Sequence, residues 1–193
     1  MKKTLDCLAK AFIGESMARN RYTMYSKIAK KEGFEQIAEI FLITADNERE
    51  HAAQIFIMID ELKINAKKFD ALHVGAEVPT TYSTTAENLK AAIAGENYEH
   101  AIMYPEFAAI AKTERLAEVS DRLLAIAKAE EHHEERYLKL LRVVEDGTVF
   151  KKEIEVAWVC RECGYVHYGK VPPAKCPSCG HERAYYQVKC EEY

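Results

Sequence analysis

The sequence lacks several features that would assign it to a particular class of protein. None of its segments is both long and apolar enough to span a membrane. It has no excess of basic residues, since 27 Lys and Arg stand against 31 Asp and Glu, and this argues against nucleic acid as the main partner. A secretory leader is not indicated, because Asp6 and Lys10 interrupt the apolar N-terminal run. The sequence therefore predicts a cytoplasmic protein that binds neither membranes nor nucleic acid.

Cysteine is sparse and unevenly distributed. Of the six cysteines, four form two Cys-x-x-Cys pairs close to the C-terminus. That clustering indicates metal binding rather than a disulfide framework. The 193 residues can form one large domain or a domain with a small module, and the change of composition from Trp158 onward favours the second arrangement.

Most of the chain carries apolar residues at alternating steps of three and four, the pattern of amphipathic helices. Four helices are expected, over about 4–31, 35–62, from Thr84 to at least Ile110, and 115–145. Gly33 and Gly147 are placed to end two of them, and Pro105 should kink the third. The aperiodic segment 65–85 is too long for a tight turn and suits a crossover connection. The sequence therefore predicts a four-helix bundle.

Ionisable residues interrupt the apolar stripes of these helices. Glu48 with His51 and Glu130 with His133 have the same Glu-x-x-His spacing, so on a helix each carboxylate shares a face with its imidazole. A lone motif of this kind is more often part of a salt-bridged surface, but two copies on buried faces favour metal ligands. A buried carboxylate is costly unless it has a partner, a proton or a cation.

Further carboxylates lie on the inward faces of the other two helices. Glu15 precedes Glu48 by almost the interval at which Glu96 precedes Glu130, and this internal pseudo-repeat would bring the four residues to one level of the bundle. One Glu from each of two helices and Glu-x-x-His from the other two is the ligand set of ferritin-like di-iron proteins. Such a set suits iron or manganese better than zinc. The predicted ligands are Glu15, Glu48, His51, Glu96, Glu130 and His133.

Three more residues are candidates for this site. Glu99 also faces inward and exceeds the common ligand set; it either orients a histidine or binds a metal in only one redox state, and the second interpretation is preferred. Tyr22 and Tyr104 are expected to lie about one turn from the metals and to support the ligands. Together with His51, these three are the candidate catalytic residues.

The C-terminal segment predicts a second metal site. Cys160-x-x-Cys163-Gly and Cys176-Pro-x-Cys179-Gly flank a 12-residue spacer, and each glycine allows the backbone to bend toward sulfur. Zinc and iron share the tetrahedral four-thiolate geometry. By ligand pattern alone a structural zinc ribbon is the commoner answer, whereas beside a di-iron bundle a single-iron electron carrier is more economical.

Taken together, these features closely resemble the rubrerythrins over essentially the whole chain. The resemblance implies a ferritin-like bundle over residues 1–147, a linker over 148–154 and a rubredoxin-like iron domain over 155–193. It is carried by Gly14-Glu15-Ser16, Glu48-Arg49-Glu50-His51, Gly95-Glu96-Asn97-Tyr98-Glu99, Met103-Tyr104-Pro105, Glu130-x-x-His133 and the two cysteine motifs.

The resemblance also implies roles for the individual ligands. Glu48 and Glu130 correspond to carboxylates that bridge two irons, and Glu15 and Glu96 correspond to terminal ligands. His133 corresponds to a ligand of the second iron. The first iron is expected to move between His51 and Glu99 when the site changes redox state. The four cysteines, Cys160, Cys163, Cys176 and Cys179, are expected to hold the rubredoxin-type iron.

The function implied is that of a peroxidase that reduces hydrogen peroxide to water and protects the cell from oxidative stress. Electrons would come from an NAD(P)H-dependent reductase, through a soluble rubredoxin, to the four-cysteine iron and then to the bundle. The helical positions of the two sites place them far apart in one chain, so a head-to-tail homodimer is expected. The alternatives are a ferritin-like iron-oxidation or storage protein and a bundle with a structural zinc ribbon.

Overall fold

The computed structural model describes residues 1–65 and 70–191 and contains a helical bundle followed by a small sheet. The long helices are α1 (Lys2–Lys31), α2 (Glu35–Asn65), α3 (Thr85–Tyr98), α4 (Tyr104–Thr113) and α5 (Ala117–Glu145). Within the described ranges, no helix is long and apolar enough to cross a bilayer. The predicted fold class, a mainly helical bundle with a small β-rich C-terminal module, is confirmed.

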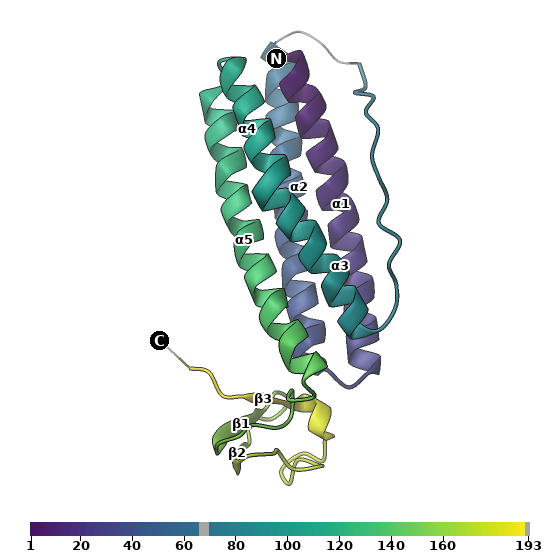
Figure 1. The fold of residues 1–193 in the computed structure, drawn as a ribbon, viewed down its shortest axis with the longest axis vertical. Coiled ribbons are helices and arrows are strands. Elements are labelled where there is room, and N and C mark those ends of the chain that lie inside the picture. The colour runs from purple at the N-terminus through teal and green to yellow at the C-terminus, as the bar shows by residue number, and fades with distance from the viewer. Residues whose placement is uncertain (66–69, 192–193) are drawn as a thin grey trace.

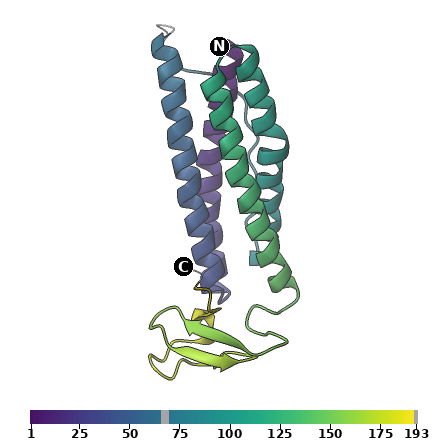
Figure 2. The same cartoon turned by 90° about the vertical axis from the view of Figure 1, so that its left-hand side faces the viewer.

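The bundle consists of two antiparallel helix pairs. Helix α1 packs along α2, and α3 and α4 pack along α5 (Figures 1 and 2). Gly33 ends the first helix in the left-handed conformation, with φ of 84°, which a residue without Cβ adopts at little cost. The segment from residue 70 to the start of α3 has no helix or strand and runs along the outside of α1, as Figure 1 shows. This is the crossover connection that the sequence predicts; residues 66–69 lie outside the described part of the chain.

The third predicted helix is interrupted by a π-helical turn over Glu99–Met103, called η1. Its last backbone bond runs from the Tyr104 amide to the Glu99 carbonyl, five residues back. Pro105 follows this turn directly, at the second residue of α4, and the kink that the sequence predicts there stays a prediction. Pro105 lacks an amide hydrogen and its ring crowds the preceding turn, and the wider π turn just before it accommodates both effects.

Two apolar clusters fill the bundle above and below a polar layer. One cluster includes Leu8, Ile55 and Leu123, and the other is rich in aromatic rings, including Tyr22, Phe41 and Tyr137. Tyr137 packs edge-on against Tyr22, with 5.5 Å between ring centroids. Burial of this apolar surface is the main source of bundle stability, and it fixes the level at which the ionisable residues meet.

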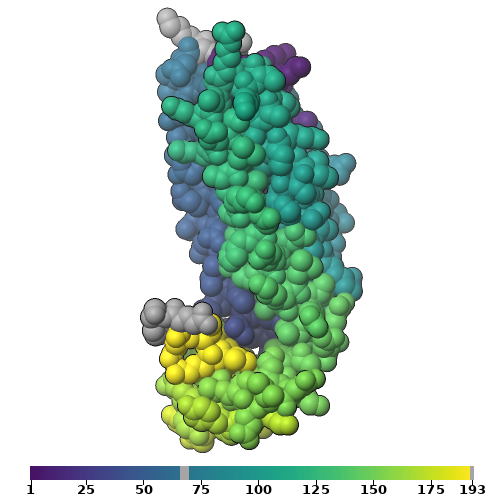
Figure 3. Space-filling view, turned by 60° about the vertical axis from the view of Figure 1, so that its left-hand side comes forward, coloured from purple at the N-terminus to yellow at the C-terminus, as the bar shows by residue number. Residues whose placement is uncertain are grey.

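The C-terminal module is a three-stranded antiparallel sheet in the order β2-β1-β3. Its strands are β1 (Val156–Cys160), β2 (Val166–Gly169) and β3 (Tyr186–Val188). Trp158 is buried at its centre and donates a hydrogen bond from Nε1 to the Gly169 carbonyl at 2.9 Å. Figure 3 shows the module as a lobe at one end of the bundle. It contacts that end through an ion pair between Arg161 and Glu39. In the segment that connects it to α5, Phe150 stacks on Phe34, with centroids 6.3 Å apart.

Candidate metal centres

Two groups of buried side chains in the bundle have the composition and spacing of metal sites. In each group, one possible ligand atom per residue lies within 4.8 Å of every other. The two groups share two carboxylates, Glu48 and Glu130, one from α2 and one from α5. A pair of carboxylates common to two adjacent groups is the arrangement in which carboxylates bridge two cations. The groups are Glu15, Glu48, His51 and Glu130, and Glu48, Glu96, Glu130 and His133.

The contacts inside these groups are close but poorly suited to hydrogen bonding. His133 Nδ1 lies 2.8 Å from Glu130 Oε2 and 3.1 Å from Glu48 Oε1. His51 Nδ1 lies 2.8 Å from Glu130 Oε1 and 2.9 Å from Glu48 Oε2. Of these four contacts only His51 to Glu48 has hydrogen-bond angles. Among the described residues, Glu48 Oε1, both oxygens of Glu130 and His133 Nδ1 have no hydrogen-bond partner. Buried lone pairs without partners are expensive, and a pair of cations would satisfy them.

Two tyrosines hold the outer carboxylates of the cluster. Tyr22 donates a hydrogen bond from its hydroxyl to Glu96 Oε1 at 2.5 Å, and Tyr104 donates one to Glu15 Oε1. All four side chains are completely buried. Hydrogen bonds of this kind orient metal-binding carboxylates, so the structure places both tyrosines where the sequence predicts their supporting role.

Glu99 occupies a different position from the other carboxylates. It is the first residue of the π-helical turn, and it belongs to neither ligand group. Its side chain is buried and lines a cavity at the surface of the bundle. Its pKa is raised by burial and by Glu96, Glu130 and Glu48, so Glu99 lies close to the cluster without joining it. The structure therefore brings together six of the seven predicted bundle ligands and leaves the seventh beside them.

Without a cation, the cluster retains protons. Burial, together with neighbouring carboxylates, raises the pKa of Glu15 well above its usual range. Burial also raises the pKa of Glu96 to about 8. For His51, burial lowers the pKa, but its close contacts with the carboxylates of Glu130 and Glu48 outweigh burial and raise it to about 9. Metal binding must displace these protons, because only the deprotonated groups are good ligands.

The four cysteines of the module converge on one point. All four Sγ atoms lie within 4.8 Å of one another, with 3.8 Å between Cys160 and Cys179 and 3.6 Å between Cys163 and Cys176. A tetrahedron with metal–sulfur bonds of about 2.3 Å has edges of about 3.8 Å, so the thiols are spaced for a four-coordinate metal.

The two cysteine turns are built in the same way. Gly164 and Gly180 have φ of 76° and 79°. Each donates a hydrogen bond from its backbone amide to the carbonyl oxygen of the first cysteine of its turn, at 2.8 Å. The positive φ is the reason that each turn ends in glycine. His181 Nδ1 also lies 3.3 Å from Cys179 Sγ, a contact that the sequence pattern did not reveal.

Several residues around the sites carry no obvious sequence signal. Arg21 from α1 lines the cavity that contains Glu99, and Arg136 donates from Nη2 to the Thr44 hydroxyl at 2.6 Å beneath the cluster. Gly14 and Gly95 directly precede Glu15 and Glu96 and also face that cavity. This repeated Gly-Glu pair was visible in the sequence, but the role of a glycine within a helix cannot be inferred until its neighbours in the fold are known.

The fold and the two sites together define a di-metal carboxylate protein of the four-helix-bundle type, with an attached four-cysteine metal domain. Comparison with known proteins specifies the family. The rubrerythrin family model matches residues 6–141, and the model of the rubredoxin-like domain of rubrerythrin matches residues 158–187. The chain belongs to the rubrerythrin family, whose members carry a di-iron site in the bundle and a rubredoxin-like four-cysteine site.

Individual relatives agree with this assignment over nearly their full length. A protein of Methanocaldococcus jannaschii is 62% identical, covering 100% of this chain and 96% of the relative. The rubrerythrin of Porphyromonas gingivalis is 48% identical, covering 99% of this chain and 92% of the relative. A solved structure of nigerythrin in a mixed-valence state aligns with a TM-score of 0.64 at 30% identity, covering 96% of this chain and 86% of that one. The family prediction and the predicted cofactors are confirmed.

Proposed function

We propose that this protein is a non-haem di-iron peroxidase that reduces hydrogen peroxide to water and protects a cytoplasm from oxidative stress. The observation that carries the proposal is the pair of ligand groups joined by Glu48 and Glu130. Two metals held by these groups would supply the redox chemistry for peroxide reduction. The four-cysteine site in the same chain supports a reaction that consumes electrons, which an iron-storage protein does not require.

The chain provides the geometry for this reaction. When bound, the two irons would supply the two electrons that, with two protons, convert one hydrogen peroxide into two waters. Glu48 and Glu130 would bridge the metals, and Glu15 and Glu96 would bind one metal each at the ends. The hydroxyls of Tyr104 and Tyr22 hold these two terminal carboxylates in place. Glu15, Glu96 and Glu130 are completely buried, which limits the contact of bulk water with the site.

We further propose that His51 and Glu99 alternate as ligands of one metal. In this structure His51 belongs to the group formed with Glu15, Glu48 and Glu130, whereas Glu99 lies outside both groups. This difference in position between His51 and Glu99 supports the proposal. Replacing Glu99 by Ala should therefore perturb the oxidised centre more than the reduced one, as judged by metal content and crystal structures of both states. Equal perturbation would leave Glu99 as an ordinary supporting residue.

The electron route is proposed to begin at a soluble rubredoxin or an NAD(P)H-dependent reductase and to pass through the iron bound to the four cysteines. We propose 1–147, 148–154 and 155–193 as the bundle, linker and rubredoxin-like domain. Arg161, next to Cys160, contacts Glu39 on α2. Glu39 precedes Glu48 by nine residues, so at 1.5 Å per residue the two levels are about 14 Å apart along the helix. A head-to-tail homodimer would shorten this path by placing each module against the bundle of its partner.

Mixed dimers test the electron route. A Cys176→Ser chain should lack the electron carrier, and a Glu130→Ala chain should lack the peroxide site, so each homodimer should be inactive in a donor-coupled assay. Mixing and reassembling the two chains should restore part of the activity, because one dimer then contains one intact path. If heterodimers form and activity does not return, electrons do not cross between chains.

Stopped-flow oxidation of the chemically reduced protein tests the peroxidase proposal itself. One equivalent of hydrogen peroxide should oxidise the bundle irons much faster than an equal concentration of dioxygen does. A ferritin-like iron-oxidation or storage protein would show the reverse preference and would accumulate added iron beyond its ligand sites. Faster reaction with dioxygen, accompanied by such accumulation, would contradict the peroxidase proposal.

A further inference from the structure

A cavity of about 510 Å³ at the bundle surface is lined by Glu99, the carboxylate that lies beside the metal-ligand cluster. It lies between α1, the region around the π-helical turn and the crossover segment, and its apolar lining includes Met17, Met103 and Phe107. Glu99 on its wall is 9% exposed, whereas Glu15, Glu96 and Glu130 are 0% exposed. The Glu99 carboxylate makes no hydrogen bond or ion pair with any residue in the described ranges. A buried carboxylate that has no hydrogen-bond partner therefore lines the cavity, and the nearby charge of Arg21 acts on it.

Two glycines keep this cavity open. Gly14 lies inside α1 and Gly95 inside α3, where glycine is less favourable than alanine. A Cβ at Gly14 would lie 3.7 Å from Glu99 Oε1, and a Cβ at Gly95 would lie 3.7 Å from Arg21 Nη2. These are ordinary contact distances, so a methyl group would fit at either position. A side chain larger than alanine would occupy the cavity itself, so the small size of these two residues keeps it open.

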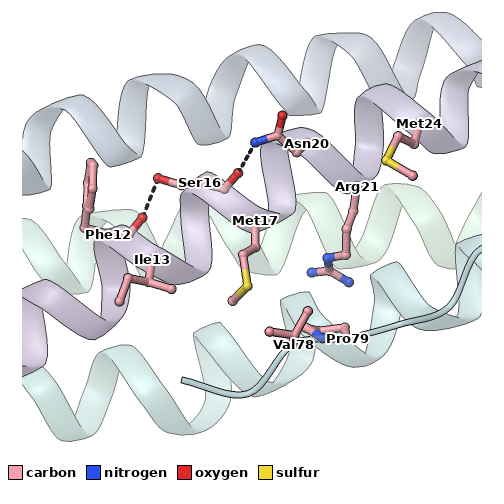
Figure 4. Close-up of a pocket in the computed structure, with 9 residues that line it drawn as sticks. All are labelled: Phe12, Ile13, Ser16, Met17, Asn20, Arg21, Met24, Val78 and Pro79. Carbon is pink, nitrogen blue, oxygen red and sulfur yellow. Dashed lines mark hydrogen bonds between the residues drawn. The ribbon is translucent and has the colours of Figure 1, made fainter. Parts of the chain in front are cut away.

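Arg21 provides hydrogen-bond donors on the wall of the same cavity. Its side chain points from α1 toward the crossover segment, together with Met17, as Figure 4 shows beside Val78 and Pro79. The guanidinium lies over the Tyr22 ring, 5.7 Å from its centroid. Its Nε is buried and has no hydrogen-bond partner in the part of the chain that the structure describes. A guanidinium has five N–H donors and no acceptor, so Arg21 can bind an oxygen-rich or anionic molecule that enters the cavity.

Resting on the peroxidase function proposed above, we propose that this cavity is the route by which a hydroperoxide reaches the metal site. Gly14 and Gly95 keep the route open, and Arg21 is a positioning residue that donates hydrogen bonds to the incoming oxygen. A water molecule occupies about 30 Å³ in the liquid, so the cavity is much larger than hydrogen peroxide needs. Larger hydroperoxides therefore serve as probes of the same route.

Replacing Gly95 by Leu tests the route, with Ala94→Leu as the matched control. Ala94 is an exposed neighbour on α3 and does not line the cavity. Oxidation of the chemically reduced protein by tert-butyl hydroperoxide should slow at least about tenfold in G95L, the equivalent of about 1.4 kcal/mol in activation free energy. Oxidation by hydrogen peroxide should slow less, and A94L should match the unmodified protein. Equal rates in G95L and A94L with both peroxides would overturn the proposal.

A second readout does not depend on turnover. Azide binding to the cobalt(II)-loaded protein, followed by the cobalt absorption bands, should be slower in G95L than in A94L. If the unmodified protein failed to react with hydrogen peroxide while G95L still slowed azide, the peroxidase function would be wrong and the access route would stand. If azide bound equally fast to both variants, the access route would be wrong even if the peroxidase reaction were confirmed.

Arg21→Gln provides an independent test of the proposal if G95L does not fold. This change removes the guanidinium at a partly exposed position and leaves the helix intact. Loss of a hydrogen bond to the substrate should raise KM for hydrogen peroxide about tenfold with little change in kcat, and Arg21→Lys should restore part of the loss. An unchanged KM in R21Q would show that Arg21 does not position the substrate. A higher KM and a lower kcat, together with lower helicity, would show a purely structural role.

Discussion

The two metal sites of this chain are built in opposite ways. The four-cysteine site consists of two short turns, and within each turn the two thiols are three residues apart and fixed by a left-handed glycine. The bundle site takes its ligands from four helical segments, and Glu15 and Glu130 are brought together across most of the bundle sequence. The first site depends on local backbone geometry and the second on long-range packing. The two should therefore respond differently to mutation.

Loss of a shared carboxylate should have the largest effect. Glu130 contributes to both ligand groups, so Glu130→Ala should remove both bundle irons while the four-cysteine iron remains. Iron content per chain and the thiolate-to-iron absorption measure the two sites separately.

Glu134→Ala is the matched control for this change. Glu134 lies one turn further along α5, where it pairs with His100 Nε2 at 2.7 Å and accepts a hydrogen bond from Asn97. It belongs to neither ligand group, so the control should keep both bundle irons. Retention of two bundle irons in the Glu130 variant would contradict the shared role of Glu130.

Loss of a cysteine should have a large effect that stays local. Cys176 lies in the small hydrophobic cluster of the module with Trp158 and Tyr186. Cys176→Ser should abolish the thiolate-to-iron absorption and loosen the module, whereas the helical circular dichroism signal should remain nearly unchanged. Exposed Cys190 provides the control, since Cys190→Ser should change neither signal. Loss of bundle helicity in the Cys176 variant would show that the module supports the whole chain.

The metal-free protein should lose stability as pH rises. Folding raises the pKa of Glu96 from 4.5 to about 8 and that of His51 from 6.5 to about 9. The folded state therefore binds these protons more tightly, so their contribution is complete below the unfolded pKa values and is lost as pH rises through the folded ones. The Tm of the metal-free protein should fall between pH 5 and pH 9. The iron-loaded protein, whose ligands carry no protons, should show a much weaker decrease over the same range. A flat profile without metal would contradict the buried protonated cluster.

Removal of a supporting hydroxyl should have the smallest effect. Tyr104→Phe keeps the buried ring but loses the hydrogen bond to Glu15. Loss of such a support commonly lowers metal affinity about 10–100-fold, and this should appear in competitive titration with a chelator without loss of helicity. Tyr82→Phe, at an exposed position in the crossover segment, should leave the affinity unchanged. Equal affinities in the two variants would show that Tyr104 serves packing alone.

Much of the architecture could be predicted because it repeats a simple period. The three-four apolar pattern located the helices and placed Glu48, His51, Glu130 and His133 on inward faces, where only a metal or a proton could explain them. The cysteine spacing and its glycines located the second site in the same way, because a turn of this kind is encoded within five residues.

What the sequence did not reveal depends on contacts between distant segments. The π-helical turn that carries Glu99 arises where Pro105 has to be accommodated within a packed helix. The cavity beside it exists only when α1, α3 and the crossover segment are assembled. The ion pair between Arg161 and Glu39 joins residues of different domains. None of these contacts leaves a periodic signal in the chain.

The most direct test of the shared-carboxylate site is a crystal structure of the iron-loaded protein with anomalous scattering measured at the iron edge. We predict two iron peaks in the bundle, about 3.5–4 Å apart as in other two-metal sites, each bonded to an oxygen of Glu48 and an oxygen of Glu130. A third peak should lie among the four cysteine sulfurs. A single bundle peak, or two peaks that share neither Glu48 nor Glu130, would contradict the account of the bundle as a di-iron centre bridged by these residues.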